Sequence, residues 1–165
     1  MTKQSKAIAD SSARATILAT VVAMVAMVPP VDAAPSNRAD PCALVTAADA
    51  QTAIGVPMGQ PKGMDDGLYR HCTYESADGR FYLYISTIDD DQASFEQGRK
   101  LTARNSKTVE GLGANAYFDP DHEMLLIWKK GILLNIQAGD HSGNTSLAQL
   151  EAHDAKAAAA AIPRL

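Results

Sequence analysis

The chain has 165 residues, of which 46% are hydrophobic, 21% are charged and 5% are aromatic. This composition is typical of one globular domain and excludes a disordered, collagen-like or coiled-coil chain. Lys and Arg together number 15 and Asp and Glu 19, which gives a formal net charge of −4. A mildly acidic chain without a basic block argues against nucleic acid or an anionic membrane surface as the main partner.

Residues 1–33 are predicted to be an export signal. Three basic residues within the first fourteen precede an apolar stretch, 17–28. These twelve residues would span about 18 Å as a helix, which is too short for a hydrocarbon core of about 30 Å. A Pro-Pro pair then interrupts the helix, and small residues at positions −3 and −1 place the cleavage after Ala33. An uncleaved N-terminal anchor is the alternative.

Export changes what is expected of Cys42 and Cys72, which lie 30 positions apart. In an oxidising compartment an isolated pair most often forms a disulfide, and closing a loop of this size stabilises a fold by roughly 3–4 kcal/mol. A redox site usually needs Cys-x-x-Cys, and a catalytic thiol needs one unpaired cysteine. We therefore predict a structural disulfide between the two cysteines.

A flexible leader is predicted over residues 34–40, followed by a short helix. Thr46 has the side chain of a helix N-cap, Asp49 lies in the first turn, and Gly55 fits the position after the helix end. The next stretch, 57–67, contains three glycines and two prolines. It is predicted to be a loop.

A β-hairpin is predicted around Asp78-Gly79, the residue pair that a two-residue type I′ turn prefers. Its strands are expected over 70–76 and 80–88. Pairing outward from this turn places Cys72 opposite Ile85, and it separates an apolar face from a more polar one. This register points Cys72 into the core, where a bridge to the first helix can form.

The second half of the chain is predicted to contain a helix, three strands and a final helix. Three aspartates precede the helix over about 92–104, where carboxylates favour the positive end of the helix dipole. A short strand is expected over 111–118, and a second hairpin has its strands over 123–129 and 132–138. One face of that hairpin is the most apolar surface of the chain and is the predicted centre of the core: Leu125, Ile127, Ile132, Leu134 and Ile136.

The final helix is predicted from a capping box formed by Ser146 and Gln149, and Pro163 is expected to end it. The order of elements predicts a single α+β domain over 41–165. We expect an antiparallel sheet of about five strands, in two hairpins plus one strand. Three helices are expected to pack on one face of the sheet.

Several segments resemble a large group of exported bacterial proteins of unknown function, many of them small lipoproteins. The start from Pro41 to Asp49, ending at Ile54-Gly55, is similar to the first segment of that group. Cys72-Thr73-Tyr74 resembles its second-cysteine strand, and the Gly-Leu-Gly start of residues 111–118 resembles another strand. The resemblance implies a disulfide-linked, sheet-based domain and supplies no reaction. The chain departs from the lipoproteins because no lipid-acceptor cysteine follows its apolar stretch.

The sequence offers little catalytic chemistry, so we expect no enzyme activity, no cofactor and no metal. It contains no Gly-x-Ser-x-Gly motif. The turn around His122 could hold a divalent cation through neighbouring carboxylates, but a solvated hairpin turn is the simpler interpretation. Ser142 follows Asp140 and His141, yet sequence neighbours rarely form a catalytic triad.

One candidate binding surface is predicted on the outward face of the first hairpin. Tyr82 and Tyr84 share this face, with His71 and Thr73 nearby, and Trp128 would extend it if the two hairpins are neighbours. Aromatic side chains on a half-exposed sheet suit a small apolar ligand or a protein partner. The alternative is that a helix covers this face.

The sequence therefore predicts a periplasmic or secreted, non-enzymatic domain with a binding or envelope-associated role. It is expected to have no stable membrane span after signal cleavage and no nucleic-acid partner. A small exported hydrolase, or an inhibitor of one, is the alternative function.

Overall fold

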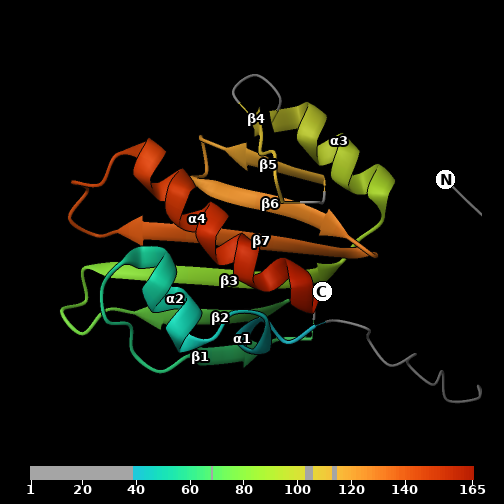
Figure 1. Ribbon diagram of the computed structural model, residues 1–165. Coiled ribbons are helices and arrows are strands. Elements are labelled where there is room, and N and C mark those ends of the chain that lie inside the picture. The colour runs from blue at the N-terminus through green and yellow to red at the C-terminus, as the bar shows by residue number, and fades with distance from the viewer. Residues whose placement is uncertain (1–38, 68, 103–105, 113–114) are drawn as a thin grey trace, which may run out of the picture. The chain divides into compact units, whose positions relative to one another are not determined.

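The computed structural model of the chain describes residues 39–67, 69–102, 106–112 and 115–165 (Figure 1). The predicted export signal, 1–33, lies outside the described residues, as does the predicted leader apart from its last two residues. Within the described ranges the chain forms one antiparallel sheet of seven strands together with four α-helices. This arrangement confirms the predicted α+β class.

The strands follow the order β1-β2-β3-β7-β6-β5-β4 across the sheet, and every neighbouring pair is antiparallel. The strands are β1 (Lys62–Asp65), β2 (Arg70–Glu75), β3 (Phe81–Asp89), β4 (Lys107–Thr108), β5 (Asn115–Asp119), β6 (Met124–Lys129) and β7 (Ile132–Asp140). The helices are α1 (Pro41–Leu44), α2 (Ala47–Ile54), α3 (Gln92–Thr102), α4 (Leu147–Ala161) and the 3₁₀ turn η1 (Ile162–Arg164).

The hydrophobic core lies between one face of the sheet and the helices α1, α2 and α4 (Figure 1). A single row of paired residues crosses this face on five neighbouring strands, and each of these residues is at most 1% exposed: Cys72, Ile85, Ile136, Leu125 and Phe118. All five residues predicted as the centre of the core are buried. Strand alternation therefore indicated correctly which face is covered.

The two predicted helix caps are present and fix where α2 and α4 begin. The backbone N–H of Asp49 donates to Thr46 Oγ1 at 3.2 Å, and the N–H of Thr46 donates to Asp49 Oδ2 at 2.9 Å. Gly55 ends α2 with a φ of 88°, in the left-handed region that glycine adopts without strain. Ser146 and Gln149 form the capping box of α4.

Helix α4 lies close to the sheet because its buried stripe consists of small side chains. Ala157, Ala158 and Ala161 are fully buried against the core. Alanine leaves room for close contact between backbones while keeping helix propensity high. This stripe agrees with the small apolar positions in the sequence of the final helix.

The register of the first hairpin is as predicted, but the predicted two-residue type I′ turn is wrong. Cys72 pairs with Ile85, and the N–H of Ser76 donates to the carbonyl of Phe81 at 2.9 Å. A type I′ turn needs positive φ at both central residues, and in the pair Asp78-Gly79 only the glycine has one. Asp78 instead accepts hydrogen bonds from Ser76 Oγ and from the N–H of Arg80, which favours a wider connection.

The predicted loop over 57–67 is also wrong, because it contains strand β1. This strand pairs with β2 over its four residues, and Met58 forms an isolated bridge with Ser76. Glycine and proline marked the segment as a loop, whereas an edge strand with exposed side chains has no apolar alternation to reveal it. The short strand β4 and the single-turn helix α1 raise the numbers of strands and helices above the prediction.

Helix α3 does not share the side of α1, α2 and α4, as the prediction of three helices on one face required. Its buried residue Phe95 packs on Tyr117, with the two ring centroids 5.4 Å apart. Tyr117 points away from its neighbours Ala116 and Phe118, which belong to the core. Helix α3 therefore packs on the other face of the sheet, at β5.

Candidate functional site

The candidate site is the sheet face of β1, β2, β3 and β7 that lies opposite α1, α2 and α4, which we call the open face. Its side chains alternate along each strand with those of the core. The described helix on this side, α3, packs on β5, away from β2 and β3. The open face carries these residues from the four strands: Met64, His71, Thr73, Tyr82, Tyr84, Ser86, Asn135 and Gln137.

His71 and Tyr84 form the aromatic centre of the open face. Thr73 pairs with Tyr84 and His71 pairs with Ser86, so the two rings are diagonal neighbours across β2 and β3. Their centroids are 5.4 Å apart with an interplanar angle of 33°, and both residues are half-buried. Of the four residues predicted for the binding surface, His71 and Tyr84 are thus in ring contact, and Tyr82 shares their face.

Tyr82 also lies on the open face, but its ring is engaged by neighbours. It pairs with Gly139, and a Cβ placed on that glycine would lie 2.0 Å from Tyr82 Cζ. His141 contacts the other part of the ring, with centroids 4.9 Å apart. Burial raises the pKa of the Tyr82 phenol. Tyr82 therefore serves packing over a glycine as well as lining the surface.

Amide side chains border the aromatic pair. Asn135 Nδ2 donates to Ser86 Oγ at 3.2 Å, and Gln137 Nε2 donates to the carbonyl of His122 at 3.1 Å. Within the described part of the chain, Asn135 Oδ1 is buried without a hydrogen-bond partner. An unsatisfied buried acceptor costs free energy.

Trp128 is not part of this aromatic surface. Trp128 pairs with Leu133 of β7, whereas Tyr84 pairs with Gln137 of the same strand. Leu133 and Gln137 are four residues apart, so Trp128 and Tyr84 are separated by roughly 13 Å along β7. Its indole N–H donates to the carbonyl of Asp90 at 3.0 Å. Trp128 instead lines a cavity of about 620 Å³ beside the β6–β7 turn. The two hairpins are neighbours, because β3 lies beside β7, but the register pairs Trp128 with a residue near the far end of β7.

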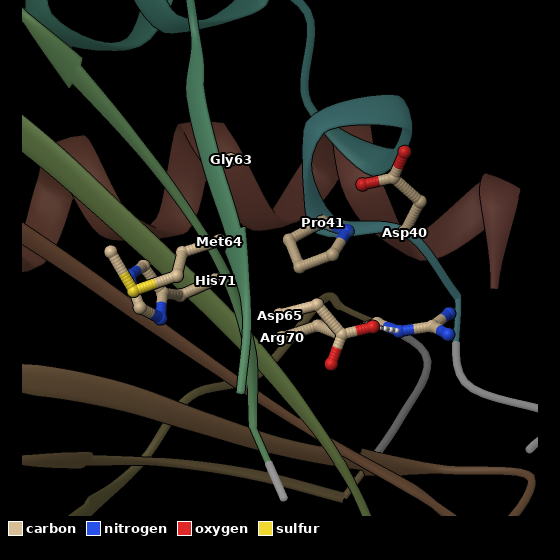
Figure 2. Close-up of a pocket in the computed structure, with 7 residues that line it drawn as sticks. All are labelled: Asp40, Pro41, Gly63, Met64, Asp65, Arg70 and His71. Carbon is tan, nitrogen blue, oxygen red and sulfur yellow. Dashed lines mark hydrogen bonds and ion pairs between the residues drawn. The ribbon is translucent and has the colours of Figure 1, made fainter. Parts of the chain in front are cut away.

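A second cavity of about 340 Å³, which we call the edge cavity, opens where β1 forms the edge of the sheet (Figure 2). Pro41 of α1 faces Gly63 and the ion pair of Asp65 with Arg70, whose Oδ2 and Nε are 2.8 Å apart. Met64 and His71 point to the other side of the strands and connect the cavity with the open face. Sequence reasoning missed this cavity because its two walls come from segments about twenty residues apart.

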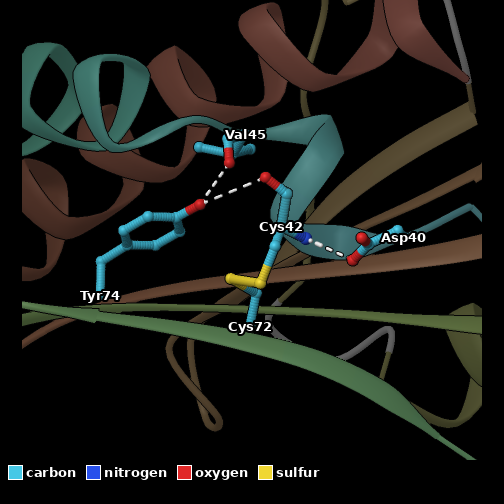
Figure 3. The surroundings of a disulfide bond; sticks show 5 residues. All are labelled: Asp40, Cys42, Val45, Cys72 and Tyr74. Carbon is cyan, nitrogen blue, oxygen red and sulfur yellow. Dashed lines mark hydrogen bonds between the residues drawn. A yellow bond between two sulfur atoms is a disulfide. The ribbon is translucent and has the colours of Figure 1, made fainter. Parts of the chain in front are cut away.

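The Cys42–Cys72 disulfide fixes α1 beside this cavity and confirms the predicted bridge (Figure 3). The two Cα atoms are 5.2 Å apart, and Cys72 is fully buried. The buried phenol of Tyr74 donates to the carbonyl of Val45 and, at 3.5 Å, to that of Cys42. Burial raises the pKa of Tyr74 to about 12, so the phenol remains a donor at neutral pH.

The residues that sequence analysis considered for catalysis have structural contacts. His122 Nδ1 lies 2.7 Å from Asp119 Oδ2, three residues earlier in the same turn. Ser142 Oγ donates to Asp140 at 2.6 Å, and hydrogen bonds from Arg80 hold the pKa of that carboxyl well below its usual range. The ring of His141 packs on Tyr82 and not on Ser142 or Asp140. Across the described residues, no group of three or more His, Cys, Asp or Glu side chains is placed to hold a metal ion.

A scan against models of known protein families, a search of curated proteins and a search of solved structures each find no match to this chain. Of the helices in the described part of the chain, none is long and apolar enough to cross a membrane.

Proposed function

We propose that the protein is an exported, non-enzymatic binding domain whose open face contacts a protein partner. The observation that carries this proposal is the His71–Tyr84 pair on a sheet face that α1, α2 and α4 leave uncovered. A half-exposed tyrosine ring contributes a large contact area, and Tyr is enriched at protein interfaces.

A protein surface fits the open face better than a small apolar ligand. Apolar ligands bind in cavities that enclose most of their surface, and neither Tyr82 nor Tyr84 lines the two cavities described above. The amide and hydroxyl groups of Asn135, Gln137 and Thr73 match the polar rim of an interface. The buried Cys42–Cys72 disulfide supports an oxidising compartment, periplasmic or extracellular, as the place of function.

Site-specific photo-crosslinking in the producing cell tests the binding surface. A photoreactive phenylalanine analogue replaces Tyr84 in one variant and exposed Leu101 of α3 in a control variant. We expect a discrete adduct with another protein from position 84, absent from position 101 and weakened when His71→Ala is added. Equal adducts from both positions, or none from position 84, would contradict the proposal.

Export is tested separately on the purified native protein. We expect its mass to correspond to a chain that begins at Ala34 and its cysteines to resist alkylation until a reductant is added. An intact initiator methionine, or two cysteines that react at once, would contradict the proposed compartment.

A further inference from the structure

We infer that Met64 and His71 form a binding site for a monovalent copper ion at the rim of the open face. The thioether sulfur of Met64 and the imidazole of His71 are its two protein ligands. This site goes beyond the proposed protein partner, with which it shares only His71, and either one can be absent without the other.

Met64 and His71 are direct neighbours on adjacent strands. They occupy paired positions of β1 and β2, and both side chains point to the same side of the sheet. Directly paired residues have Cβ atoms about 4.5–5.5 Å apart, which places the ends of a methionine and a histidine within reach of one ion. In Figure 2 the sulfur of Met64 overlaps the imidazole ring of His71. The register of the two strands therefore brings a thioether and an imidazole together.

The imidazole of His71 is available as a ligand. Within the described part of the chain its ring nitrogens have no hydrogen-bond or ion-pair partner, whereas Nδ1 of His122 and Nδ1 of His153 each have one, at 2.7 and 2.6 Å. The ring of Tyr84 packs beside the imidazole, with centroids 5.4 Å apart. This contact positions the imidazole and leaves its nitrogens uncommitted.

The exposure of Met64 leaves its sulfur accessible to an ion from solution. Met64 is 61% exposed, whereas Met58 and Met124 are half-buried, and Met58 packs against the core. Methionine usually stabilises a fold by filling irregular gaps in its core, which Met64 does not do. Its side chain is therefore free to serve as a ligand.

The two ligand types favour a soft monovalent ion. A thioether favours Cu(I) over Mg²⁺ and Ca²⁺, which prefer oxygen ligands, and imidazole also binds copper. Cu(I) accepts two ligands, so it does not require the group of three or more His, Cys, Asp or Glu side chains that the described residues lack. The ammonium of Lys62, two residues before Met64, is paired with Glu75 at 2.6 Å, which reduces its repulsion of a cation.

Thiols do not compete for the ion. The chain has two cysteines, and both belong to the Cys42–Cys72 disulfide. In the oxidising compartment proposed above, thiols are lost to disulfides, whereas a thioether remains a soft ligand. Methionine is therefore the soft ligand that such a compartment leaves available.

Anaerobic titration of the untagged, oxidised protein with Cu(I), in competition with a chromogenic Cu(I) chelator, tests this site. Ag(I), a monovalent ion of similar softness that air does not oxidise, replaces copper for NMR. We expect a single ion per chain, with the largest shifts at the methyl group of Met64 and the ring of His71.

Matched variants separate this site from other methionines and histidines. Met64→Leu keeps the size of the side chain and removes the sulfur, and His71→Phe keeps a ring beside Tyr84 and removes the nitrogens. Each should weaken Cu(I) binding by more than about tenfold, the lower end of what changes around a metal ligand cause. Met124→Leu and His141→Phe are the controls and should leave the affinity unchanged.

Three results would overturn the proposed copper site: no competition with the chelator, an unchanged affinity of folded Met64→Leu or His71→Phe protein, or shifts centred on other residues. Thermal unfolding checks that each variant is folded, and misfolding of one variant leaves the other to decide. Adducts from position 84 that persist in such a case would leave the proposed protein partner intact.

Discussion

At the scale of single residues, Asp154 is the most unusual group in the core. It is fully buried on α4, its Oδ1 accepts from the N–H of Ala138 at 2.6 Å, and its Oδ2 has no partner within the described part of the chain. Burial raises its pKa to about 9, and the nearby charges of Glu123 and Glu151 act in the same direction. The folded protein therefore keeps this carboxyl protonated at neutral pH.

This raised pKa predicts a stability that falls with pH. Between about pH 4 and pH 9 the folded state binds a proton that the unfolded state has lost, so the free energy of unfolding decreases as pH rises. The loss is on the order of a few kcal/mol. Asp154→Asn keeps the acceptor and removes the titration, so its urea unfolding at pH 5, 7 and 9 should show a much smaller decline. Parallel declines in both proteins would contradict this assignment.

Gly139 provides a second test at the residue scale. A methyl group there would collide with the Tyr82 ring, so Gly139→Ala should destabilise the fold by about 1–3 kcal/mol. Tyr82→Ala removes the obstacle, and the added cost of Gly139→Ala should then largely disappear. A double-mutant cycle by chemical denaturation measures this coupling. Additive effects would show that the Tyr82 ring is not the source of that cost.

At the scale of elements, α1 is held by more than its disulfide. Thr87 Oγ1 donates to the carbonyl of Ala39 at 2.9 Å, Arg164 Nη1 donates to that of Leu44 at 2.6 Å, and Tyr74 donates to Val45. Replacing both cysteines with alanine should therefore lower the free energy of unfolding by roughly 3–4 kcal/mol and leave α1 in place. Denaturation and hydrogen exchange of the α1 amides check the two parts. Complete loss of amide protection would show that the bridge alone keeps α1 on the sheet.

The close contact of α4 with the sheet predicts a strong dependence on side-chain size. Ala157→Leu should destabilise the fold by at least about 1–3 kcal/mol, because the fully buried site has no space for three more carbons. Ala159→Leu, on the exposed side of the same helix, should change stability by less than about 0.5 kcal/mol. Thermal unfolding of the two variants compares them directly, and similar melting temperatures would contradict the packing described.

At the scale of the whole molecule, the sequence predicted what depends on local periodicity. Alternation indicated that Cys72 and Ile85 face the core, and the caps at Thr46 and Ser146 indicated where two helices begin. The sequence did not predict β1 and β4, because short edge strands with exposed side chains show no alternation of apolar and polar residues. It also placed α3 on the wrong face, since one anchor, Phe95, does not say which side of the sheet a helix covers.

The candidate site was predictable only in part, because local periodicity indicates contacts within a hairpin and not contacts between distant segments. His71 and Tyr84 lie on adjacent strands of one hairpin, so their contact follows from the register. The position of Trp128 depends on β7 lying between β3 and β6, which is set by pairing distant in sequence. The edge cavity depends on where α1 packs against the sheet, and no periodic pattern in the sequence predicts that position.

The longest pairing in the sheet has a kinetic consequence. Strands β3 and β7 have nine residues each and join the two halves of the sheet, although more than forty residues separate them along the chain. A ribosome or a translocation channel releases β7 long after β3, so the central seam cannot close until β7 has emerged. Loop closure of this length slows folding, and during that interval the apolar edge of β3 is open to chaperones and to aggregation.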